Sequence, residues 1–78
     1  MKIGEIRQYI DQWHCGLYTG PDESSDKKEI AHINVSKPFL ILSIDRPYFG
    51  NGRRWAKVLA KDKVGFIIIS DTTTEIVR

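Results

Sequence analysis

The stretch RWAKVLAKDKVGFIII, residues 54–69, decides the fold class of this chain. In an extended conformation Val58 falls on one face of its first half, while Trp55 and Lys57 fall on the other. A short polar turn follows, and then a run rich in the β-branched residues that suit a pleated sheet. The stretch therefore predicts a β-hairpin with Val58 facing the core.

The rest of the chain after residue 30 continues this strand character. Residues 30–35 alternate weakly, and residues 39–44 (FLILSI) form an apolar run that is too short for a typical helix. Residues 46–53 (RPYFGNGR) carry the proline and the Asn-Gly pair that are typical of a loop. The polar residues 20–26 predict a second loop, and residues 75–77 predict a short closing strand.

The N-terminal segment allows two interpretations. Ile3, Ile6, Ile10 and Trp13 recur at helical spacing, which predicts a short amphipathic helix over residues 3–13. A strand over the same residues would instead place Ile6 and Ile10 on one face. Periodicity leaves both open, and the family resemblance described below favours the strand.

The length and the cysteine count limit what the chain can be. With 78 residues it is one domain, residues 1–78, and a chain of this size buries only about 60% of its unfolded surface. Cys15 is the single cysteine, so no internal disulfide is possible and a cytoplasmic location is expected. No apolar run approaches the roughly 20 residues that span a bilayer, so we expect no membrane association.

Charge is distributed unevenly along the chain. Residues 46–63 hold six basic side chains against one acidic side chain, a net charge of +5. Residues 20–29 hold two basic against four acidic side chains, a net charge of −2. The basic stretch is therefore a candidate contact surface.

The residue types that carry catalysis or metal binding are scarce. His14, Cys15 and His32 are the only soft or borderline ligands, whereas a structural zinc site generally takes four, so we expect no metal and no cofactor. A nucleophilic Cys15 would need a base and an orienting group, and His32 is the only histidine that is not its immediate neighbour. Residues 50–52 lack the lysine and helix of a phosphate-binding loop. We expect no catalytic residues and no enzyme activity, and a small core favours a shallow surface groove.

One group of residues combines flat aromatic surface with cations. Such a group can stack on bases and contact phosphates, or pack on an extended acidic or proline-containing peptide. We rank a protein partner above nucleic acid because the net charge is modest. The candidate partner-binding residues are Tyr48, Phe49, Arg53, Arg54, Trp55 and Lys57.

Residues 55–67 resemble the last long hairpin of SH3 domains, in which a tryptophan opens one strand and a Gly-aromatic-Ile triplet lies in the next. Residues 39–44 and the loop at 46–53 resemble the strand and n-Src loop that precede that hairpin. The resemblance covers about half the chain and implies a five-stranded, all-β, SH3-like barrel with Trp55 at the ligand-stacking position. The Ala-Leu-Tyr-Asp-Tyr type motif is absent and Ile68 replaces a groove proline, so PxxP recognition is not implied.

A second resemblance involves residues 3–6 (IGEI) and 15–20 (CGLYTG). They are similar to the opening and the Gly-x-x-x-Gly turn of small SH3-like and KOW-type barrels, including short ones from bacteriophages. This resemblance implies a viral or bacterial source and, as the alternative function, contact with nucleic acid or the transcription machinery.

Overall fold

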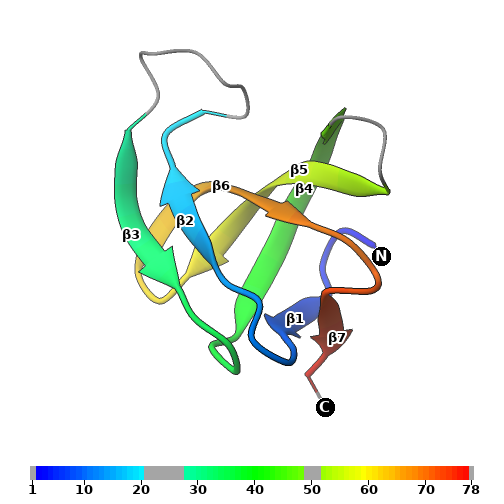
Figure 1. Ribbon diagram of the computed structural model, residues 1–78. Coiled ribbons are helices and arrows are strands. Elements are labelled where there is room, and N and C mark those ends of the chain that lie inside the picture. Colours follow the sequence, from blue (N-terminus) through cyan, green and yellow to red (C-terminus); the bar gives the residue numbers. More distant parts are fainter. Residues whose placement is uncertain (1, 21–27, 49–51, 78) are drawn as a thin grey trace.

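The structure is a computed structural model that describes residues 2–20, 28–48 and 52–77, with the backbone alone described for residues 46–48. Every regular element in these ranges is a strand and none is a helix, which confirms the all-β prediction (Figure 1). The strands are β1 (Ile6–Tyr9), β2 (Cys15–Tyr18), β3 (Glu29–Ile33), β4 (Phe39–Tyr48), β5 (Arg53–Ala60), β6 (Lys63–Ile69) and β7 (Thr74–Ile76).

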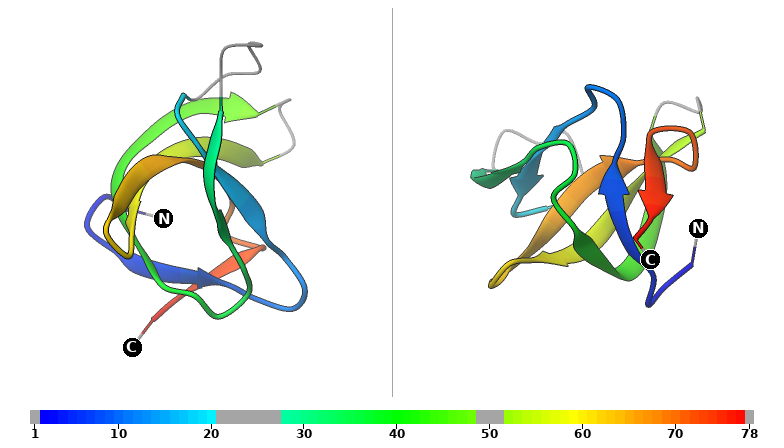
Figure 2. Two further views of the ribbon diagram at one scale, coloured as in Figure 1. Left: turned by 90° about the vertical axis from the view of Figure 1, so that its left-hand side faces the viewer. Right: turned by 90° about the horizontal axis from the view of Figure 1, so that it is seen from below.

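The strands form one antiparallel sheet in the order β3-β2-β6-β5-β4-β1-β7. The sheet curls around its concave face into a half-barrel, which the two views of Figure 2 show. β3 and β7 are its edges. The described chain thus has seven strands, so the prediction of five was wrong.

One strand that the sequence analysis missed is β2, whose residues were interpreted as a glycine-rich turn. Gly16 lies buried within this strand and pairs with His32 of β3. A Cβ atom at Gly16 would collide with the carboxylate of Glu29, which lies over this position. The glycine therefore makes room for a neighbouring side chain and does not mark a turn.

The predicted loop at residues 46–53 is shorter than expected. β4 continues to Tyr48, which pairs with Arg53 of β5. The register between the two strands shifts between Ile44 and Pro47. A bulge of this kind lets a strand carry a proline, because the residue without an N–H need not take part in the ladder.

The N-terminal segment forms β1 and no helix. Its buried residues are Arg7 and Tyr9, whereas Ile6 is 48% exposed. The strand interpretation is therefore confirmed for residues 6–9 and the helical one is wrong, and the face that carries Ile6 turns outward. Tyr9 fills the inward position, with its ring centroid 5.6 Å from that of Phe39.

Arg7 is a buried cation, and each of its three guanidinium nitrogens has a polar partner. Its Nε donates to Thr74 Oγ1 at 2.9 Å and its Nη2 to the Thr74 carbonyl at 3.1 Å. Its Nη1 donates to Glu5 at 3.0 Å, and Asp71 lies 3.6 Å from Nη2. These contacts satisfy the guanidinium away from water and join β1 to β7.

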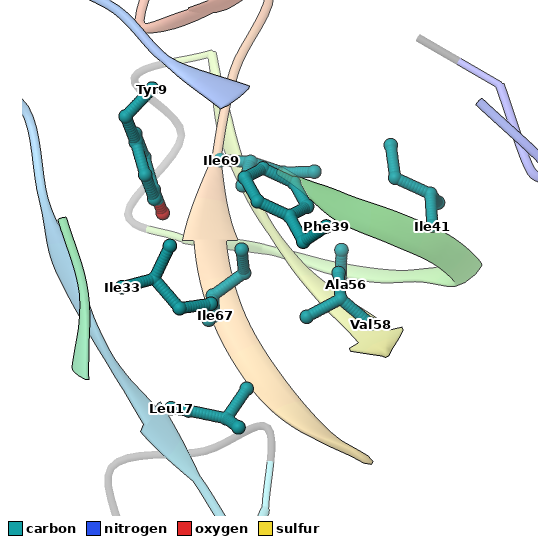
Figure 3. Close-up of a cluster of buried hydrophobic side chains, with 9 residues drawn as sticks. All are labelled: Tyr9, Leu17, Ile33, Phe39, Ile41, Ala56, Val58, Ile67 and Ile69. Atoms are coloured by element: carbon teal, nitrogen blue, oxygen red, sulfur yellow. The ribbon is translucent and has the colours of Figure 1, made fainter. Parts of the chain in front are cut away.

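The core lies on the concave face of the sheet. Side chains from β1 to β6 converge there (Figure 3). Val58 is fully buried, which confirms its predicted inward orientation. The complete cluster is Tyr9, Leu17, Ile33, Phe39, Ile41, Ala56, Val58, Ile67 and Ile69.

β2 and β6 approach each other closely at Gly65. A Cβ atom at this position would lie 2.7 Å from Cγ of Leu17 and 2.8 Å from the carbonyl oxygen of Tyr18. One of these obstacles is backbone, which cannot rotate away. Gly65 is thus the position that allows β2 to pair with β6 through Tyr18 and Phe66.

Candidate partner-binding surface

The six predicted partner-binding residues are not all described by the structure. Phe49 lies outside the described residues, and Tyr48 is described only as backbone in β4. The other four lie on β5, where alternation places Arg53, Trp55 and Lys57 on one side and Arg54 on the other.

Trp55 lies on the predicted face, opposite Val58, but its side chain is only 2% exposed. The ring of Tyr18 packs edge-on against it, with the ring centroids 6.0 Å apart. The expectation that Trp55 presents its ring at the edge of a groove was therefore wrong. Alternation identified the face of the sheet correctly, but β2 supplies an aromatic neighbour that the sequence analysis did not include.

Arg54 and Lys57 are exposed, as a contact surface requires. The Arg54 guanidinium donates to the carbonyl oxygen of Asp45 from Nε at 3.2 Å and from Nη2 at 3.0 Å. Lys57 shares the outer face of β5 with Trp55. Both cations are thus available at the surface, although they lie on opposite faces of the strand.

Arg53 is paired with an aromatic ring that the sequence analysis had not assigned to the site. Its Cζ atom lies 4.7 Å from the ring centroid of Trp13, a cation–π geometry. Trp13 is 40% exposed and lies in the connection between β1 and β2. No spacing signal links residues 13 and 53, since sheet curvature brings them together. In this Trp13–Arg53 pair the aromatic ring is exposed and the arginine is half-buried.

A small cavity of about 110 Å³ lies beside this pair. Tyr9 reaches it from the core and donates its hydroxyl to the carbonyl oxygen of Ile68. The cavity is smaller than the roughly 300–1,000 Å³ typical of small-molecule sites. Its lining residues are Tyr9, Trp13, His14, Cys15, Arg53, Ile68 and Thr73.

Burial strongly raises the pKa of the Tyr9 phenol, and the neighbouring Cys15 raises it further. Because the folded-state pKa lies above the ordinary value of about 10, the stability contribution is complete below pH 10 and is lost as the pH rises beyond it. We expect the urea midpoint to fall more steeply between about pH 9.5 and 11.5 in the unmodified protein than in Tyr9→Phe, which cannot ionise. Parallel curves for the two proteins would contradict this expectation.

The basic stretch identified from charge does not form one surface. Arg53 opens β5, whereas Lys61 and Lys63 lie at the turn beyond its other end. A strand rises about 3.3 Å per residue, so these two ends are roughly 25 Å apart. Lys61 and Lys63 instead line a groove of about 340 Å³ between the edge strand β3 and the β5–β6 turn. The expectation of a single basic contact surface was therefore wrong, because Arg53 lies at one end of β5 and Lys61 and Lys63 lie beyond the other.

Comparison with protein-family models, curated proteins and solved structures finds no match to this chain. Among the described residues there is no helix of the length and apolar character needed to cross a bilayer. In the same part of the chain, His, Cys, Asp and Glu side chains do not gather in groups of three or more that could hold a metal ion.

Proposed function

We propose that this chain is a non-catalytic binding module with an SH3-like half-barrel, which engages a protein partner through its outer surface at the start of β5. The observation that carries the proposal is the Trp13–Arg53 pair, in which an exposed tryptophan ring meets a half-buried arginine. Tryptophan and arginine are the side chains most enriched among residues that dominate binding energy.

The chemistry of the surface favours an acidic partner segment. Arg53 and Lys57 supply two cations on one face of β5, and Arg54 adds a third on the opposite face. Trp13 adds a flat ring that is 40% exposed, whereas Trp55 is buried and adds no exposed ring. In an extended acidic peptide, the carboxylates would pair with the cations and an apolar side chain would pack on the ring of Trp13.

Nucleic-acid binding, which the KOW-type resemblance implies, is the second candidate. A tryptophan ring with neighbouring arginine and lysine can stack on a base and contact phosphates. The separation of the basic stretch into two ends of β5 favours the protein partner, because a phosphate backbone is bound best by a continuous basic groove.

Substitution of Trp13 by alanine is expected to leave the fold intact and to weaken partner binding at least about 30-fold, as for an aromatic hot spot worth about 2 kcal/mol. The partner is first captured from the native host and identified by mass spectrometry with and without nuclease. Binding of the purified partner is then measured for Trp13→Ala and Arg53→Gln, with Lys61→Ala at the far end of β5 as the matched control.

Equal affinity of Trp13→Ala and Lys61→Ala would reject the proposed surface. If capture depends on nucleic acid and affinity falls steeply with salt, the second candidate replaces the first, because each neutralised phosphate releases counterions.

A further inference from the structure

Two histidines that are 18 positions apart in the sequence meet on the surface of the sheet. His14 lies just before β2 and His32 lies in β3. Nδ1 of His14 is 2.9 Å from Nε2 of His32, and the ring centroids are 4.9 Å apart. Both side chains are exposed, so a solvated ion can reach the nitrogen atoms.

The second nitrogen of His32 has its own partner. Nδ1 of His32 lies 3.4 Å from Oε1 of Glu29. Gly16 makes this arrangement possible, because a side chain at Gly16 would occupy the space of the Glu29 carboxylate. A carboxylate on the far nitrogen orients an imidazole and fixes which nitrogen is free, as in many metal sites.

The two facing nitrogens share a hydrogen bond, and their separation of 2.9 Å is also that of two ligands in one coordination geometry. Imidazole nitrogens bind divalent transition metals at about 2.0–2.1 Å. Two such ligands at a right angle are therefore about 2.9 Å apart, whereas a tetrahedral angle separates them by about 3.3 Å. Right angles between nitrogen ligands are typical of Cu²⁺ and Ni²⁺.

We propose that His14 and His32 form a two-histidine site for a divalent transition metal, Cu²⁺ or Ni²⁺. Nδ1 of His14 and Nε2 of His32 are the ligands, and Glu29 positions the ring of His32. In the metal-free form one nitrogen donates its proton to the other, and the metal ion takes the place of that shared proton.

The site leaves most of the coordination sphere to other ligands. Among the residues that the structure describes, no third His, Cys, Asp or Glu side chain completes the set. Cys15 follows His14 but packs against the core. The remaining positions are open to water or to a donor atom from a second molecule. This inference does not depend on the partner-binding proposal, since neither Trp13 nor Arg53 takes part.

The test is titration calorimetry of the untagged protein with Ni²⁺ or Cu²⁺, with Mg²⁺ as the control ion. We expect one saturable site for Ni²⁺ and for Cu²⁺, and none for Mg²⁺, which prefers oxygen ligands. Affinity should fall at least tenfold in His14→Ala and in His32→Ala. Circular dichroism checks that each variant is folded. We expect both variants to fold, because His14 and His32 are exposed.

Two further variants separate the proposed ligands from their neighbours. Cys15→Ser should keep the affinity, because the thiol is not a ligand, and Glu29→Gln should lower it about tenfold. Absence of saturable binding, or binding that survives in the double variant His14→Ala/His32→Ala, would overturn the site. Unchanged affinity in Glu29→Gln would overturn the positioning role of that carboxylate.

Discussion

Replacing Trp55 with alanine is expected to remove most of the free energy of unfolding of the protein at ambient temperature. The side chain is 2% exposed, and truncation of a buried tryptophan costs about 3–5 kcal/mol through lost burial and a residual cavity. A domain of this size has only about 5 kcal/mol of stability to lose. Urea denaturation followed by tryptophan fluorescence and far-UV circular dichroism measures the effect.

Two variants serve as references for Trp55→Ala. Val58→Ala removes a smaller, fully buried side chain and should cost about 1–3 kcal/mol, whereas Trp13→Ala removes a half-exposed ring and should cost about 1 kcal/mol or less. A Trp55→Ala protein with an almost unchanged urea midpoint and weak partner binding would contradict the buried position. Such a result would support Trp55 as an exposed partner-binding residue.

Gly65→Ala is expected to destabilise the fold by about 3 kcal/mol. The added methyl group would lie 2.8 Å from the carbonyl oxygen of Tyr18 and 2.7 Å from Leu17, so β2 must move away from β6. A thermal melt should show the loss of stability. Amide hydrogen exchange should show faster opening of β2 than of β5, because β2 and β6 pair only through Tyr18 and Phe66.

Gly20→Ala is the matched control, because a Cβ atom at Gly20 has no neighbour within 4 Å. Its melting temperature should stay within a few degrees of the unmodified protein, which corresponds to less than about 0.5 kcal/mol. Similar melting temperatures for Gly65→Ala and Gly20→Ala would show that the contact between β2 and β6 is looser than the structure has it.

The parts of the fold that could be predicted are those held by local patterns. Alternation through Val58 and the polar turn at Lys61 are enough to define the hairpin of β5 and β6, because neighbouring strands meet through a short connection. β2 could not be predicted in the same way. Its glycine has the composition of a turn, and only its pairing with β3 and β6 makes it a strand.

The candidate site could be predicted from local sequence patterns to an even smaller extent than the fold. Periodicity predicted that Trp55 and Val58 lie on opposite faces, which is confirmed, but whether a face is covered depends on a distant strand. The contacts of Trp13 with Arg53 and of His14 with His32 join segments far apart in the sequence. No local pattern encodes such contacts, because the pairing of β2 with β3 creates the histidine contact and the fold of the whole sheet brings Trp13 to Arg53.

The pairing of β1 with β7 has a consequence for how the molecule is made. β7 is the outer neighbour of β1, and Arg7 has its hydrogen-bond partner Thr74 67 positions later in the chain. Until residues 74–76 have left the ribosome, β1 presents an open edge and a cation without its final acceptors. Closure of the sheet at this edge therefore depends on contacts of long sequence separation, which form slowly in folding.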